Sequence, residues 1–235
     1  MMFGCRKEEA VSNDLSLVKK LSKALSPAFG RMRTLLRKIS GFFPELLCRM
    51  RYRSSLYRSS CRIAKYSDLK KDRGAYGEFL VYDALRREKG RWLFNLYLPK
   101  GEEKTEIDAL LLSERGIFLL ESKNFSGRVY GSVGNPEWFH TFETSRGIKK
   151  QRFFNPIMQN SAHKKALCRL IGREEVIFPM VVFGKNTDLR VQAPKEYSKE
   201  LMTLKRLPSA VHSFEKGALE QEEIERLYGV LEPYT

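Results

Sequence analysis

The spacing of apolar residues divides this chain into a basic first part and a more regular second part. From Leu15 to Leu47 apolar residues recur at helical intervals among Lys and Arg, with breaks at Pro27 and over 41–44. This pattern predicts short basic amphipathic helices, which could lie on a membrane or pack on a partner. Residues 49–65 are denser in Arg and Ser with tyrosines between them, and we interpret them as a linker or a nucleic-acid-contacting arm.

The pattern becomes regular at Gly74. Residues 74–89 carry apolar side chains at helical spacing, and Gly90 follows where a helix would end. Three short apolar runs come next, separated by Pro, Gly and charged turns, and they predict consecutive antiparallel strands. These runs are Trp92–Leu98, Glu106–Leu112 and Ile117–Lys123.

The following segment predicts a hairpin, a helix and a buried strand. Gly127–Val133 and Trp138–Phe142 have the pattern of a hairpin that turns through 134–136. After a basic loop, Pro156 begins a helix that runs to about Ile171. Residues 176–183 are almost wholly apolar, which is typical of a strand buried on both faces.

These elements follow the order αβββαβ, with further helices expected near 208–216 and 218–229. The sequence therefore predicts an α/β fold with a mixed α+β sheet, preceded by a basic, partly helical extension. We place that extension at 1–68, the main domain at 69–188 and a helical elaboration of the same domain at 189–235.

Charge is distributed unevenly between these parts. Residues 1–73 contain 18 Lys and Arg against 6 Asp and Glu, whereas residues 74–235 contain 25 against 22. A basic arm on a nearly neutral domain suits a polyanionic partner, either nucleic acid or an anionic membrane surface. The alternative is a solvated basic face without a partner.

The four cysteines form no C-x-x-C pair, so neither a zinc knuckle nor a redox motif is indicated. We expect reduced thiols in a cytoplasmic protein. No run approaches the length of a membrane span. Peripheral contact of residues 15–47 with a membrane stays open as an alternative.

A cluster of charged residues is expected on the second and third strands. If the turn between them is symmetric about Glu114 and Arg115, Asp108 lies opposite Glu121 and Glu106 lies opposite Lys123. All four side chains would then emerge on one face of the sheet. The repulsion between two facing carboxylates is roughly 3 kcal/mol at an effective dielectric near 20, and a divalent cation would offset it.

A purely structural interpretation of this cluster is also open. In that interpretation Glu106 forms a cross-strand salt bridge with Lys123, and Asp108 or Glu121 caps a backbone amide. Charged residues at such spacing are common, so the pattern by itself is weak. Its position on a central hairpin, in this order of strands, favours the functional interpretation.

Four short motifs together resemble those of the nuclease-related domain family, NERD, over about residues 74–184. They are Gly74-x-x-Gly77-Glu78, Glu106-Ile107-Asp108, Glu121-Ser122-Lys123-Asn124 and Asn155-Pro156-x-x-Gln159. That family belongs to the PD-(D/E)XK superfamily, which has a restriction-endonuclease-like core. The resemblance implies a hydrolase that cleaves phosphodiester bonds of nucleic acid, more readily DNA than RNA. A nucleic-acid-binding or membrane-surface module that no longer cuts is the alternative.

The resemblance also implies roles for individual residues. Asp108 and Glu121, with the carbonyl of Ser122, would hold Mg²⁺ or Mn²⁺, because such hard cations prefer oxygen ligands. Lys123 would orient the attacking water and stabilise charge on the phosphate. Glu78 would support the metal site from the first helix, although it could instead be a helix-terminal Glu favoured by the dipole.

The second helix and the loop before it supply the remaining candidates. Gln159 and His163 share an apolar helix face and need partners, which the acidic strands could provide. This resembles the Gln-x-x-x-Tyr element of some related nucleases, with His163 in place of Tyr, and a satisfied core histidine is the alternative. Asn155 and Pro156 are expected to cap and open the helix. Nucleic acid would contact His163 and three loop residues, Lys149, Lys150 and Arg152. The alternative for the three loop residues is a solvated loop without a partner.

Overall fold

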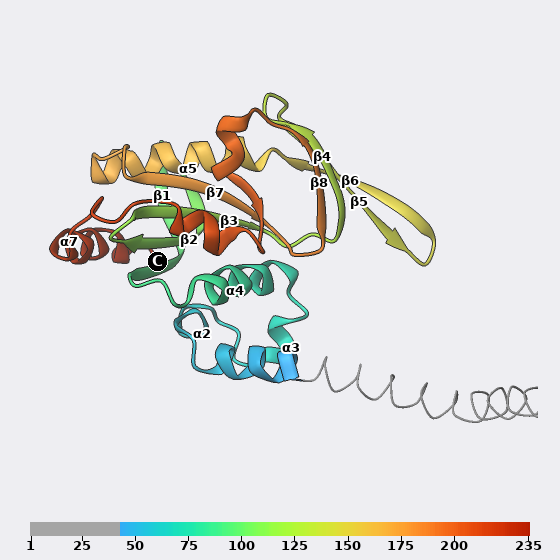
Figure 1. Ribbon diagram of the computed structural model, residues 1–235, viewed down its shortest axis with the longest axis horizontal. Helices are drawn as coiled ribbons and strands as arrows, with labels where there is room; N and C mark the ends of the chain where they lie inside the picture. The colour runs from blue at the N-terminus through green and yellow to red at the C-terminus, as the bar shows by residue number, and fades with distance from the viewer. Residues whose placement is uncertain (1–42) are drawn as a thin grey trace, which may run out of the picture. The chain divides into compact units, whose positions relative to one another are not determined.

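The computed structural model of this protein describes residues 43–235, of which 52–235 form one compact unit (Figure 1). Residues 43–53 are helical. The unit begins with α2 (Leu56–Ser60), α3 (Tyr66–Leu69) and α4 (Arg73–Leu85), followed by β1 (Arg91–Lys100), β2 (Glu103–Ser113) and β3 (Gly116–Lys123). It continues with β4 (Gly127–Ser132), β5 (Glu137–Thr144), β6 (Gly147–Phe154) and α5 (Pro156–Ile171). The remaining elements are β7 (Ile177–Phe183), β8 (Thr187–Gln192), β9 (Leu201–Thr203), α6 (Leu207–His212) and α7 (Gln221–Leu231), with short 3-10 turns at Lys195–Lys199 and Glu232–Tyr234.

The main sheet has five strands in the order β1-β2-β3-β7-β9. The strands β1, β2 and β3 are antiparallel neighbours, as the sequence predicts, whereas β3, β7 and β9 run parallel. Figure 1 shows α5 on one side of this sheet and α4 on the other. The predicted mixed α/β class and the αβββαβ order are therefore confirmed.

Leucine and isoleucine side chains fill the layer between the sheet and the helices α5 and α7. Leu110 and Leu119 of the central strands pack there with Leu167 of α5 and Leu227 of α7, and all four are fully buried. This layer makes the central strands rigid, which fixes the position of any group at their ends.

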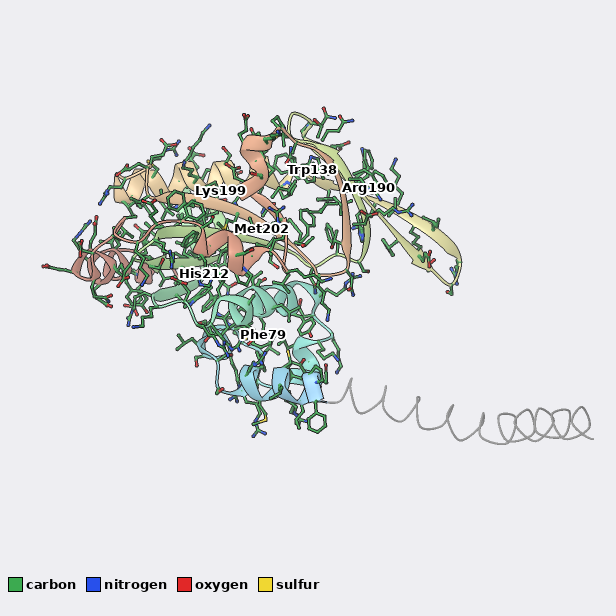
Figure 2. All side chains as sticks on the ribbon, viewed as in Figure 1. Phe79, Trp138, Arg190, Lys199, Met202 and His212 are labelled. Atoms are coloured by element: carbon green, nitrogen blue, oxygen red, sulfur yellow. The ribbon has the colours of Figure 1, made fainter. Side chains whose placement is uncertain are left out.

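The segment over 52–69 packs as part of the same unit. Tyr52 and Tyr57 are buried against Phe79 of α4, which Figure 2 labels, and Tyr57 also contacts Phe94 of β1. The interpretation of 49–65 as a linker or arm is thus wrong for the tyrosines, which the surrounding Arg and Ser concealed in the sequence. The domain boundary at 68 stays a prediction.

A second sheet, in the order β6-β5-β4-β8, follows directly after β3. The predicted hairpin is present as β4 and β5, and Trp138 is buried beneath it (Figure 2). The predicted basic loop is wrong, because its residues form β6 and pair with β5 along their whole length. Neither β8 nor β9 was predicted, since both lie in short segments of mixed polarity.

Candidate active site

The central hairpin has the predicted register. Ala109 pairs with Leu120 and Leu110 pairs with Leu119, so Asp108 and Glu121 come directly after the last paired residues. The backbone N–H of Ser122 donates to Asp108 Oδ2 over 2.8 Å. At this point a side-chain hydrogen bond takes the place of the backbone hydrogen bonds between β2 and β3, and the pairing of the two strands ends.

The alternation of side chains in β1 and β2 reverses at one shared position. Asn95 has φ +53° and is the single non-glycine residue with positive φ among 43–235. The pairs on either side of it place it opposite Asp108. Odd- and even-numbered residues exchange faces at this position. In β1, Leu93 packs in the layer beneath α5 and α7 before Asn95, and Leu96 and Leu98 pack there after it. In β2, Ile107 packs there before Asp108, and Leu110 and Leu112 pack there after it.

This reversal corrects one prediction. Glu106 does not lie beside Lys123 on a common face. It is exposed and accepts a hydrogen bond from the hydroxyl of Tyr97 over 3.0 Å. A regular strand would have kept Glu106 and Asp108 on one side, and the interruption at Asn95 and Asp108 places them differently.

Glu121 is 1% exposed and lies between two cationic or titratable groups. Its Oε1 is 2.5 Å from Lys123 Nζ. Its Oε2 is 3.5 Å from His163 Nε2, longer than a normal hydrogen bond, and neither of these atoms has a closer partner in the described structure. Burial opposes ionisation, but His163 and the Lys123 ammonium outweigh it, so the pKa of Glu121 is lowered.

At Asp108, in contrast to Glu121, the effects that raise the pKa outweigh those that lower it. Burial, together with the negative charges of Glu121 and Glu78, raises the pKa of Asp108 well above its ordinary value. The Ser122 N–H and the Lys123 ammonium oppose this shift without cancelling it. The site therefore holds neighbouring carboxyl groups that cannot all ionise without further positive charge.

Glu78 approaches these carboxylates from α4. Tyr57 of α2 donates a hydrogen bond to Glu78 Oε2 over 2.9 Å. Burial raises the pKa of Glu78, the Tyr57 hydrogen bond lowers it, and Glu106 and Glu121 raise it further. Glu78 thus faces the sheet, as its helical position predicts.

Gly77 allows the close approach of α4 to the end of β3. A Cβ built on Gly77 would lie 2.6 Å from Asn124 Cβ and 2.8 Å from Ser122 Oγ. Asn124 also donates from Nδ2 to the carbonyl of Arg73 over 2.9 Å. These contacts hold the start of α4 against the residues that follow Glu121.

The helix α5 supplies the opposite wall of the site. The side chain of Asn155 accepts from the N–H groups of Ile157 and Met158, which confirms its predicted role as a cap. Gln159 Oε1 is 3.3 Å from Lys123 Nζ. His163 Nδ1 is 2.8 Å from the hydroxyl of Thr105. Gln159 and His163 therefore both find partners at the acidic strands, as their helix face predicts.

Residues 73–184 match the family model of the nuclease-related domain. This chain contains a nuclease-related domain. An uncharacterized protein of Bacillus anthracis is 29% identical over 128 residues, which cover 54% of this chain and 58% of that relative. The chain thus spans little more than half of its relative's length. No solved structure matches the chain.

The nuclease-related domain brings together Glu78, Asp108, Glu121, Lys123 and Gln159 from the predicted set. His163 lies beside them, but its side chain is 4% exposed, so the predicted contact with nucleic acid does not fit its position. Lys149, Lys150 and Arg152 lie elsewhere. Their contacts are within the second sheet, where the Lys150 ammonium sits 4.0 Å from the centre of the Phe139 ring and Arg152 pairs with Glu137.

Two partners of the domain's carboxyl cluster were not predicted. Tyr57 precedes the family match. In the sequence it differs from its Arg and Ser neighbours only in being aromatic. Thr105, which contacts His163, stands in a charged turn region with no pattern to single it out. Asn95 interrupts an apolar run, and this polar break was the available signal for the reversal at Asp108.

The donor set at this site fits a hard cation in part. Among residues 43–235 no three His, Cys, Asp or Glu side chains stand close enough to hold a metal ion together. Asp108 and Glu121 supply carboxylate oxygens, and Glu121 Oε2 is buried without a hydrogen-bond donor. Mg²⁺ and Mn²⁺ prefer oxygen ligands, and Mg²⁺ keeps several waters, so two carboxylates and the Ser122 carbonyl could supply part of the coordination shell.

Proposed function

We propose that the nuclease-related domain hydrolyses phosphodiester bonds of nucleic acid, DNA more readily than RNA, with bound Mg²⁺ or Mn²⁺. The observation that carries this proposal is the buried Asp108–Glu121 pair with Lys123 bonded to Glu121. Burying several carboxyl groups at one point destabilises a fold, so a functional reason is the simplest account of their presence.

Asp108 and Glu121 would hold the cation, with the Ser122 carbonyl as a third ligand. When bound, the cation would lower the pKa of its water and neutralise charge that develops on the phosphate. The Lys123 ammonium contacts Glu121, and the Ser122 N–H donates to Asp108. These contacts orient both carboxylates before any ligand enters.

Lys123 would contribute directly to the reaction. Its ammonium lies between Glu121 Oε1 and Gln159 Oε1, and both are acceptors. Held in this way, the ammonium has a third N–H for a phosphate oxygen or an attacking water. Gln159 fixes the position of Lys123 and so acts through it.

A cleavage assay with plasmid DNA, single-stranded DNA and RNA in Mg²⁺ or Mn²⁺ tests this proposal. Asp108→Asn keeps an acceptor for the Ser122 N–H, and Lys123→Met keeps the length of the side chain. Each should lower cleavage at least a hundredfold. Asp68→Asn and Lys71→Met change an exposed ion pair between α3 and the residues that follow it, and both variants should cleave like the wild type. Equal activity in all five proteins, or none in the wild type with either cation, would overturn the proposal.

A further inference from the structure

A cleft of about 910 Å³ opens next to the acidic cluster. Its lining includes Glu78 and Glu106, Asn95 and Tyr97 of β1, and the turn after α2. A second hollow of about 330 Å³ shares residues 59, 61, 62 and 63 of that turn. The turn after α2 is thus a common wall of both.

The charges along these hollows are separated by sign. Asp72, Glu78, Glu106 and Glu232 line the first hollow, whereas Arg53 and Arg58 line the second and Arg62 lines both. Carboxylates therefore predominate in the first hollow, and the second hollow has only arginines as charged lining residues.

The three arginines are available to a ligand. Arg53, Arg58 and Arg62 are exposed, and within residues 43–235 none of them has a carboxylate at ion-pair distance. Some other arginines of this unit have such a partner: Arg115 pairs with Glu88 and Arg173 pairs with Glu223. Three exposed guanidinium groups without a carboxylate partner thus lie within ten residues of sequence, and Arg58 donates one N–H to the carbonyl of Arg53 over 3.1 Å.

The position of α2 relative to the active site is fixed by its buried side. Tyr57 is 1% exposed, packs on Phe79 and Phe94, and donates to Glu78. Arg58, the next residue, therefore points outward from a helix that is attached to the site itself. A ligand bound by the arginines would be held at a constant distance from the carboxylates.

We propose that Arg53, Arg58 and Arg62 bind the phosphate backbone of nucleic acid and hold it along the cleft. Guanidinium groups recognise phosphates with paired hydrogen bonds, and several along one wall suit a chain of phosphates better than a single ion. The carboxylates of the first hollow repel phosphates, so the arginines must supply the attraction. This inference rests on the proposed function for the class of ligand, nucleic acid, and not on cleavage.

Binding measured without cleavage tests this assignment. The protein is prepared with Asp108→Asn, and fluorescence anisotropy follows its binding of a labelled single-stranded oligonucleotide at increasing NaCl. Arg53→Gln, Arg58→Gln and Arg62→Gln are combined in one variant. A charge-matched control combines Arg87→Gln, Arg169→Gln and Arg206→Gln, which are exposed arginines on other elements. Thermal melts check that both variants stay folded.

Loss of three phosphate contacts should reduce the slope of log affinity against log salt by about 2 for a single strand, while the control keeps the slope of its parent. The assignment would be overturned if the slope stayed unchanged in the variant that lacks Arg53, Arg58 and Arg62, or if the slope changed equally in the control. It would also be overturned if the variant that lacks Arg53, Arg58 and Arg62 lost binding to anionic lipid vesicles but still bound the oligonucleotide like its parent. Because no cleavage is measured, failure of the proposed nuclease activity would leave this result unaffected.

Discussion

Asn95 lies opposite Asp108 across the β1–β2 ladder, and its left-handed backbone stands at the point where both strands reverse their alternation. Asparagine adopts this conformation more readily than other residues with a side chain. The reversal moves Glu106 to the side of Tyr97 and leaves Asp108 between Glu121 and Glu78. The acidic cluster therefore depends on an irregularity in the edge strand of the sheet.

Substitution of Asn95 should separate backbone strain from side-chain contacts. Asn95→Gly removes the cost of positive φ, so we expect an unchanged or slightly higher free energy of unfolding. Asn95→Val should lower it by about 1–2 kcal/mol, because a β-branched residue resists the left-handed region. Urea denaturation of the three proteins measures these differences. Equal stability of the valine and glycine variants would contradict the backbone argument.

The regular parts of this fold could be predicted from the sequence, and the irregular parts could not. Pro156 and the apolar spacing after it predicted α5 to the residue at both ends. The register of the central hairpin followed from the symmetry of its turn. The reversal at Asn95 could not follow from a two-residue period, and Tyr57 could be assigned to Glu78 only once the packing of α2 was known.

Gly77 and Gly74 form a matched pair on α4. Gly77→Ala should lower the free energy of unfolding by about 1–3 kcal/mol, because its methyl group would overlap Asn124 and Ser122. Gly74→Ala meets no atom closer than 3.4 Å, so the better helix propensity of alanine should leave stability equal or higher. Thermal denaturation of both variants measures the contrast. Similar melting temperatures for the two variants would show that α4 can shift away from β3.

The raised pKa of Asp108 predicts how stability depends on pH in a chelator. The folded state keeps the Asp108 proton to a higher pH than the unfolded chain, whose group titrates near its ordinary value of 3.8. The free energy of unfolding should therefore fall as pH rises from that value through the folded pKa. Asp108→Asn lacks this penalty while the neighbouring Glu78, Glu121 and Lys123 remain.

Denaturation of Asp108→Asn and wild type from pH 4 to 8 with EDTA measures this difference. The variant should become more stable than the wild type as pH rises, and the gap should level off above the folded pKa. Added Mg²⁺ should stabilise the wild type and not the variant, since only the wild type keeps both carboxylates. A gap that narrows with rising pH would contradict the predicted sign.

Tyr57→Phe tests whether α2 positions a carboxylate of the active site. The ring contacts with Phe79 and Phe94 remain, but Glu78 loses its hydrogen bond, so stability should fall by about 1 kcal/mol. That bond lowers the pKa of Glu78, and its loss should move the acidic limb of the cleavage profile to higher pH. Tyr82→Phe is the matched control, because within residues 43–235 the Tyr82 hydroxyl makes one hydrogen bond, a long one of 3.5 Å that it accepts from the Leu56 N–H. If both variants move the acidic limb equally, or neither does, Tyr57 has only a packing role.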